Sequence, residues 1–273
     1  MRATPTQPLR VALIGWGAIG QTVGRLLRQS ADADRIELVA VGVQDRGRAR
    51  RDFPAGVALI DDPDEMAAHR PNVVAEAAGR DSVEPWGRAA LACGADLIVS
   101  SVSAFADQDR LAALRALADR TGTAIHIQPG AIAGVDALAA ARLMGIDHVE
   151  HRIIKPPAAW AGTEAAETVD LDALAEPAVL FVGSASQTAA AYPKNANVAM
   201  TTALAGIGPD QTVVSLIADP GASNRHEISA RGAFGHLDVQ IANSPLPDNP
   251  KTSAMAALAL VRAITHRAAT IVV

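Results

Sequence analysis

Three glycines near the start of the chain have the spacing of a phosphate-binding loop. The loop spells Gly-x-Gly-x-x-Gly and comprises Gly15, Gly17, Ala18, Ile19 and Gly20. In such loops the first glycine permits a tight turn, the second lets backbone amides approach a pyrophosphate, and the third lets a helix pack closely on a strand. The positive end of that helix then faces the phosphates. The spacing therefore predicts a dinucleotide site.

The residues on either side of the loop favour the same prediction. Residues 11–14 are four consecutive apolar residues, as a strand covered on both faces requires. After the loop, Ile19, Val23 and Leu27 repeat every four residues, which is typical of a helix that packs one side on a sheet. A glycine-rich turn without a ligand would not explain three glycines at this spacing.

A charged segment follows the second expected strand, residues 36–43, where the adenosine ribose should lie. Asp45 stands there, with Arg46 and Arg48 behind it. An acidic residue at this point accepts hydrogen bonds from the ribose hydroxyls of NAD, whereas arginine pairs with the extra phosphate of NADP. We expect NAD as the cofactor, with NADP as the alternative. A solvated turn without a ligand is the competing interpretation.

Polar residues beside tight turns mark three segments of the second half. The segments are residues 155–163 (KPPAAWAGT), 193–198 (PKNANV) and 218–227 (ADPGASNRHE). A helix that begins with lysine and asparagine suits a carboxylate or a carboxamide. The third segment delivers His226 to the start of a strand, and histidine exchanges protons near neutral pH. His226 is therefore the candidate for proton transfer, and a structural histidine is the alternative.

The elements that must position these residues fall into two groups. Strands expected at 57–60, 72–77, 95–102 and 123–127 alternate with helical segments, of which 81–93 and 107–120 are the clearest. This alternation predicts a Rossmann-type, doubly wound parallel sheet in an α/β fold. From residue 147 the alternation stops. Segments 226–234 and 236–242, the second with regular apolar and polar alternation, predict a second α+β domain with a mixed or antiparallel sheet.

These patterns predict the domain organisation. We expect a dinucleotide-binding domain at 1–133, completed by a C-terminal helix within 250–273, and a substrate-binding, catalytic and dimerisation domain at 134–249. An extended connection is expected at 245–250, after which Thr252 or Ser253 caps the final helix. Residues 271–273 are strand-like.

Composition narrows the class of function. The 273 residues carry a formal charge of −5 and show no basic patch, which disfavours nucleic-acid and membrane partners and favours a small-molecule substrate. The single cysteine, Cys93, excludes an internal disulfide and fits a reducing compartment; with no export segment, we expect a cytoplasmic protein. Cys93 precedes a strand, on the side away from expected ligands, and is interpreted as core filler. No metal-ligand spacing is present.

Several motifs together resemble the L-aspartate dehydrogenase family. They are the glycine loop, residues 155–163 and 193–198, Ala218-Asp-Pro220 followed by Asn224-x-His226-Glu-Ile228, Gly232-Ala-Phe-Gly235, and Asn249-Pro-Lys-Thr-Ser253. The resemblance implies an NAD(P)-dependent homodimer that oxidises L-aspartate through iminosuccinate. Iminosuccinate is then hydrolysed to oxaloacetate and ammonia or passed to NAD biosynthesis.

The resemblance also implies residue roles. It places the catalytic histidine at His226, a cofactor-contacting alanine at Ala131, and a cofactor-contacting asparagine at Asn195 or Asn197. For the two substrate carboxylates, the expected cations are Lys194 and Lys251, with Arg231 as a further candidate. Asn197 and Thr252 are expected to add hydrogen bonds.

Two alternative functions remain open, a dihydrodipicolinate-reductase-like enzyme and a non-catalytic module, and a third is disfavoured. Residues 150–155 echo the paired-histidine segment of dihydrodipicolinate reductases, although the second histidine is absent. A semialdehyde dehydrogenase is disfavoured because Cys93 is misplaced for acyl-enzyme chemistry. A non-catalytic NAD-sensing module would keep the glycine loop but would not need lysines, asparagines and a histidine in one site.

Overall fold

The computed structural model describes residues 7–164 and 169–272, except for the side chains of residues 194, 250 and 251. The chain clusters into two compact units. One comprises Met1–Gln128 and Ala256–Val273, and the other comprises Pro129–Met255. Within the described ranges, no helix combines the length and the apolar character needed to cross a membrane.

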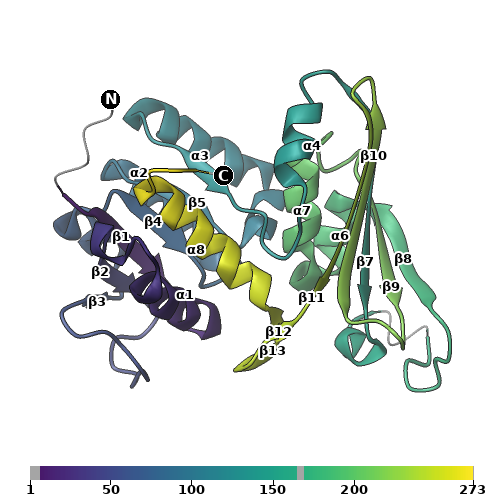
Figure 1. Ribbon diagram of the computed structural model, residues 1–273, viewed down its shortest axis with the longest axis horizontal. Helices are drawn as coiled ribbons and strands as arrows, with labels where there is room; N and C mark the ends of the chain where they lie inside the picture. The colour runs from purple at the N-terminus through teal and green to yellow at the C-terminus, as the bar shows by residue number, and fades with distance from the viewer. Residues whose placement is uncertain (1–6, 165–168, 273) are drawn as a thin grey trace. The chain divides into compact units, whose positions relative to one another are not determined.

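A six-stranded parallel sheet forms the centre of the first unit (Figure 1). Its strands, in spatial order, are β3 (Ala58–Ile60), β2 (Ile36–Gly42), β1 (Leu9–Ile14), β4 (Val73–Glu76), β5 (Asp96–Val99) and β6 (Ile125–Ile127). Because β1 pairs with β2 on one side and β4 on the other, the winding direction reverses there. This is the Rossmann strand order, and ligands bind at such a switch point. The predicted doubly wound parallel sheet is confirmed.

The sequence of the first unit explains these strands. The middle of β1 is an uninterrupted apolar run, and Val11, Ala12 and Leu13 are fully buried, as expected where both faces of a sheet are covered. The main helices are α1 (Ala18–Gln29), α2 (Val83–Ala92), α3 (Gln108–Thr121) and α8 (Ala254–Ala268). In α3, the Asp107 carboxylate caps the first turn by accepting from the Arg110 amide at 3.0 Å.

Helix α8 is tied to the first unit by ionic and backbone contacts. Arg267 pairs with Asp96 at 2.8 Å, and Arg35 donates to the Ala268 carbonyl at 3.0 Å. The strand-like character predicted for residues 271–273 is wrong for 271 and 272, which form no strand and are exposed. Apolar β-branched residues need a neighbouring strand to pair with, and propensity alone does not supply one. Residue 273 lies outside the described residues.

A five-stranded mixed sheet forms the second unit. The strands, in spatial order, are β11 (Gly235–Asn243), β10 (Asn224–Gly232), β7 (Ile146–Lys155), β9 (Val213–Ala218) and β8 (Ala178–Ser184). Strands β7 and β9 run parallel, and the other neighbours run antiparallel. The predicted mixed sheet is confirmed. The helices of this unit are α4 (Val135–Ala141), α6 (Ala185–Ala191) and α7 (Ala196–Ala205).

Alternation along β7 gives this sheet two different faces. Val149, His151 and Ile153 are fully buried, whereas Arg152 between them is exposed. The hydroxyl of Thr202 on α7 lies 2.9 Å from the His151 ring, so the buried face is the one that the helix covers. The other face is polar and carries ion pairs such as Arg152 with Glu227 at 2.7 Å.

The connection to the last helix differs from the prediction. Residues 245–253 form a two-stranded antiparallel ribbon, β12 (Pro245–Leu246) and β13 (Asn249–Ser253), instead of a single extended segment. The chain turns between the two strands, so that Pro245 pairs with Ser253. Ser253 is the helix cap, because its Oγ accepts from the Met255 amide at 3.2 Å.

Candidate active site

The glycine loop meets both a steric and an electrostatic requirement for a dinucleotide. Gly15 has φ +96, and a Cβ there would lie 2.8 Å from the Ala77 carbonyl oxygen; at Gly20 it would lie 2.1 Å from the Gly15 oxygen. At Gly17 no described atom lies within 4 Å of an added Cβ. The fold thus requires Gly15 and Gly20, whereas the space beside Gly17 is open to a ligand. Among described residues no side chain caps α1, so the amides of its first turn can meet phosphates.

The carboxylate of Glu76 joins the loops that follow β4 and β5. Glu76 is fully buried at the end of β4. Its Oε1 accepts from the amides of Ala78 and Gly79, both at 2.8 Å, and from the Ser101 hydroxyl at 2.9 Å. Its Oε2 accepts from the Ser101 amide at 2.9 Å. This organising residue was not predicted, since its partners lie up to 25 positions away in the sequence.

Asp45 and Arg46, which follow β2, have different hydrogen-bond and ion-pair partners. Asp45 is exposed and accepts from the Gly47 amide at 2.8 Å. Arg46 pairs with Asp61 at 2.7 Å and also with Glu65. The charge of Arg46 is therefore already matched by two carboxylates, whereas the Asp45 carboxylate stays at the surface.

His226 is buried beside a second histidine. It is 2% exposed, and on β10 it pairs with Ile153 of β7 and Ile241 of β11. Its Nδ1 lies 3.2 Å from Nε2 of His151. Burial, with the nearby Lys155 ammonium, lowers the pKa of His226 to about 3, so the ring is neutral near pH 7.

Lys155 is the cation that the structure places next to His226. It is the last residue of β7; its Nζ donates to Asn195 Oδ1 and lies 5.5 Å from the centre of the Trp160 ring. Burial lowers the pKa of Lys155 to about 8. Within the described residues no carboxylate pairs with it. Lys155 is the first residue of the polar segment 155–163, but it was not predicted as a site residue. A lysine followed by two prolines in that segment was the available signal.

The structure distinguishes the two candidate asparagines. Asn195 ends the turn Pro193–Asn195, is 8% exposed and contacts Lys155. Asn197 lies in the first turn of α7 and is exposed. Through its contact with Lys155, Asn195 joins the group around His226.

Ala131 is held by a chain of hydrogen bonds from the ribbon. Its carbonyl accepts from Asn243 Nδ2 at 2.9 Å, and Asn243 Oδ1 accepts from the Ser253 hydroxyl at 2.8 Å. All three residues are buried. Asn243 and Ser253 thus fix the backbone at the predicted cofactor-contacting alanine, a role that sequence reasoning did not assign to Asn243.

The structure says less about the residues predicted to bind the substrate carboxylates. The side chains of Lys194 and Lys251 lie outside the described residues. Thr252 accepts from Asn249 Nδ2 at 3.0 Å. Arg231 lies on β10 but is exposed, and strand alternation puts it on the opposite face from His226. The structure therefore does not bring Arg231 to His226.

Cys93 is not arranged as a nucleophile. The Cys93 thiol donates to the Ala90 carbonyl at 3.2 Å, and burial raises its pKa. It is therefore a thiol near pH 7 and not an activated nucleophile. Within residues 7–164 and 169–272 no three histidine, cysteine or acidic side chains are arranged to hold a metal ion.

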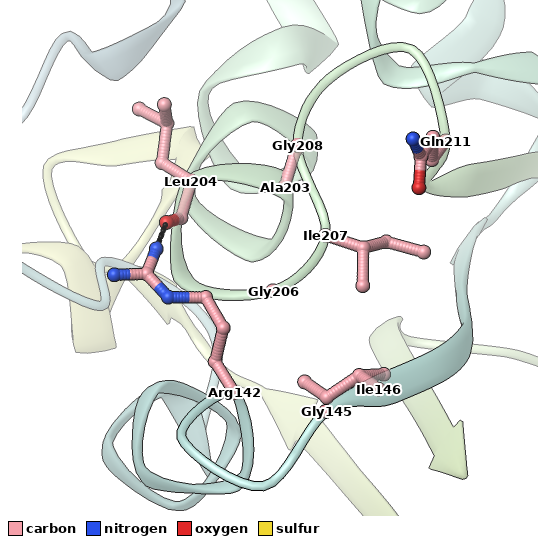
Figure 2. Close-up of a pocket in the computed structure, with 9 residues that line it drawn as sticks. All are labelled: Arg142, Gly145, Ile146, Ala203, Leu204, Gly206, Ile207, Gly208 and Gln211. Carbon is pink, nitrogen blue, oxygen red and sulfur yellow. Dashed lines mark hydrogen bonds between the residues drawn. The ribbon is translucent and has the colours of Figure 1, made fainter. Parts of the chain in front are cut away.

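The second unit also has an open depression of about 460 Å³, and its lining does not include His226 or Lys155 (Figure 2). It is lined by Arg142, Gly145, Ile146, Ala203, Leu204, Gly206, Ile207, Gly208 and Gln211. The guanidinium of Arg142 in this lining donates a hydrogen bond to the Leu204 carbonyl at 3.2 Å. Ile146 starts β7, while His226 pairs with Ile153 near its other end, about 23 Å along the strand. The depression is separate from the candidate site.

Comparisons with known proteins find two matching family models, similar curated relatives and a similar solved structure. Residues 136–267 match the family described as aspartate dehydrogenase, C-terminal, and residues 15–128 match the homoserine dehydrogenase NAD-binding domain. An L-aspartate dehydrogenase of Brucella anthropi is 51% identical, covering 96% of this chain and 98% of the relative. One from Cupriavidus necator is 42% identical, covering 95% and 98%. The crystal structure of Thermotoga maritima aspartate dehydrogenase superposes with a TM-score of 0.76 at 24% identity, covering 97% and 99%.

Proposed function

The chain belongs to the L-aspartate dehydrogenase family, and on that premise we propose that it oxidises L-aspartate to iminosuccinate, using the site around His226 and Lys155. It is an NAD(P)-dependent oxidoreductase. Iminosuccinate is then hydrolysed to oxaloacetate and ammonia, or leaves the enzyme as a precursor for NAD biosynthesis. The reaction is reversible.

One observation carries the proposal for the substrate. The Lys155 side chain is partly buried, its ammonium lies near the neutral His226 ring, and no carboxylate of the described chain pairs with it. A buried charge without a counterion is costly unless a ligand supplies the opposite charge. A dicarboxylate substrate supplies it. We assign Lys155 to one substrate carboxylate, and Lys194, Lys251 and Thr252 remain the proposed partners of the other.

The chemistry proceeds in two balanced steps. In the first, hydride leaves Cα of aspartate in its neutral-amine form, the nitrogen lone pair forms the C=N bond, and the nitrogen then releases one proton to solvent. The bound dinucleotide supplies the hydride acceptor. In the second, water adds to the C=N carbon, and C–N cleavage gives oxaloacetate and ammonia.

His226 has the properties that the second step requires. A neutral imidazole can orient the water and take its proton as the C–O bond forms, and it returns that proton in the reductive direction. A ring protonated near neutral pH could not accept that proton. The low pKa of His226 keeps the ring neutral, which is the form that has a free lone pair for the water proton.

Asn195 and Ala131 are the proposed contacts on the nicotinamide side of the cofactor. Asn195 is preferred to Asn197 because it is buried and lies next to Lys155. Its Oδ1 is engaged by the ammonium, which leaves its amide protons for a carboxamide or carboxylate. The glycine loop and Asp45 are proposed to hold the pyrophosphate and the adenosine ribose. NAD is preferred to NADP because Arg46 is already paired with acidic residues.

A homodimer formed through the second unit and residence in the cytoplasm complete the proposal. The homodimer is proposed from the family resemblance, and residence in the cytoplasm is proposed from the single cysteine. Size-exclusion chromatography with light scattering tests the dimer.

A substrate panel tests the activity itself. Reduction of NAD and NADP is followed with aspartate, glutamate, alanine, homoserine and malate, and the reverse reaction with oxaloacetate plus ammonium. Aspartate should exceed the other substrates by at least about tenfold in kcat/KM. Homoserine or malate as the preferred substrate would overturn the proposal, and so would NAD binding without turnover.

A further inference from the structure

Three buried polar groups form a line that ends at His226. Thr202 on α7 has its Oγ1 2.9 Å from His151 Nδ1, and His151 has its Nε2 3.2 Å from His226 Nδ1. Thr202 and His151 have no exposed surface. The reaction described above uses only His226 from this line, so the two inner groups lack an explanation.

The single hydroxyl proton of Thr202 sets the direction of the line. The same Oγ1 lies 3.1 Å from the carbonyl oxygen of Val198, one turn earlier in α7. A carbonyl only accepts, so the hydroxyl donates to Val198 and accepts from Nδ1–H of His151. The reverse arrangement would give up the bond to Val198 in a buried place, where a lost hydrogen bond is costly.

The two imidazoles then have defined proton positions. Burial keeps His151 neutral by holding its pKa well below the usual value. A neutral imidazole with its proton on Nδ1 has a lone pair on Nε2, and that lone pair accepts from Nδ1–H of His226. Nε2 of His226 is left without a proton. In the part of the chain that is described, nothing hydrogen-bonds to that nitrogen.

We propose that Thr202 and His151 are positioning residues that fix His226 in the tautomer whose Nε2 accepts the proton of the attacking water. The role of the water rests on the proposed function, but the tautomer itself does not. Unlike a carboxylate partner, a neutral imidazole orients the ring without adding a negative charge that would favour its protonated form.

The other groups around His226 are compatible with this arrangement. Strand β7 contributes His151 and the Lys155 ammonium, which disfavours a protonated His226. On β11 the paired residue is Ile241, and α7 (ANVAMTTALA) contains no titratable side chain. Arg225 and Glu227, the neighbours of His226 on β10, pair with each other on the opposite face of the sheet.

The tautomer can be read directly by NMR. Two-bond ¹H–¹⁵N correlation spectra of the full-length protein at pH 7, assigned with the His226→Gln variant, report which ring nitrogen carries the proton. We expect Nδ1–H on both His226 and His151. A spectrum showing His226 protonated on Nε2 would overturn the proposal. This measurement needs no turnover, so it still decides the tautomer if the protein proves inactive on aspartate.

A matched pair of variants tests the effect on catalysis. Thr202→Val removes the hydroxyl and keeps the shape, whereas Thr202→Ser keeps the hydroxyl. We expect Thr202→Val to lose about tenfold or more in kcat, with KM for aspartate changed by less than about twofold and part of the His226 proton moved to Nε2. Thr202→Ser should stay within about twofold of the parent. Equal losses in both variants, or wild-type turnover in Thr202→Val, would contradict a positioning role.

Discussion

The ammonium of Lys155 donates to the side-chain carbonyl of Asn195, and within the described residues it meets no carboxylate. This contact joins the end of β7 to the turn that precedes α7. It gives the site a positive charge held by a neutral group. An amide oxygen orients the ammonium without cancelling its charge, so the attraction for an anionic substrate is preserved.

Replacing Lys155 by methionine should stabilise the fold and abolish aspartate binding. The pKa of Lys155 falls from 10.5 to about 8 on folding, so the native protein binds fewer protons between these values. Stability therefore rises with pH through that window, and below about pH 8 the charge is a cost. We expect Lys155→Met to gain about 2 kcal/mol at pH 7 in urea unfolding, a gain that disappears above about pH 10.5. A loss of stability at pH 7 would contradict the uncompensated charge.

Removing the His226 ring should separate catalysis from cofactor binding. His226→Gln should lower kcat by about 10²-fold or more, while the Kd for NAD, measured by fluorescence titration, changes by less than about twofold. His236→Gln is the matched control, because His236 is exposed on β11 and pairs with Asp238. If NAD affinity falls as far as turnover does, His226 has a structural role.

Two glycines of the phosphate loop should respond differently to alanine. Gly20→Ala places a Cβ 2.1 Å from the Gly15 oxygen and should cost about 2 kcal/mol or more in the free energy of unfolding. Gly17→Ala meets no described atom within 4 Å and should leave the melting temperature nearly unchanged. It should nevertheless weaken NAD binding at least about tenfold, because the methyl group fills the space for the pyrophosphate. Unchanged NAD affinity in Gly17→Ala would place the phosphates elsewhere.

Asp45 should decide the choice between the two dinucleotides. Asp45→Ser keeps a side-chain acceptor for the Gly47 amide but removes the charge. We expect kcat/KM for NAD to fall about tenfold and that for NADP to be maintained. Arg46→Gln is the control: since Arg46 is paired with Asp61 and Glu65, its loss should leave NAD use unaltered. A parent enzyme that prefers NADP would refute this assignment.

Local patterns predicted the fold well. The glycine loop could be predicted because the strand before it and the helix after it are its neighbours in the sequence. Strand β11 could be predicted because the two unlike faces of its sheet give alternating apolar and polar residues. The ribbon at 245–253 was missed because prolines at 245, 247 and 250 argue against paired strands, even though Pro247-Asp248 is a typical turn sequence. The strand-like end at Ile271 lacked a partner strand.

The site was harder to predict because its contacts join distant positions. His151 and His226 lie 75 residues apart and meet only because the β7–β10 register sets Ile153 opposite His226. No periodicity in the sequence fixes that register. The turn Pro193–Asn195 directs Asn195 inward and leaves Asn197 exposed, a distinction that composition does not carry.

The return of α8 to the first unit has a consequence for biosynthesis. Arg267 and Ala268 bind Asp96 and Arg35, residues translated more than 170 positions earlier. Helix α8 must therefore emerge from the ribosome before the first unit can finish folding. A nascent chain stalled anywhere in the second unit would leave the seat of α8 uncovered and would be a natural target for chaperones.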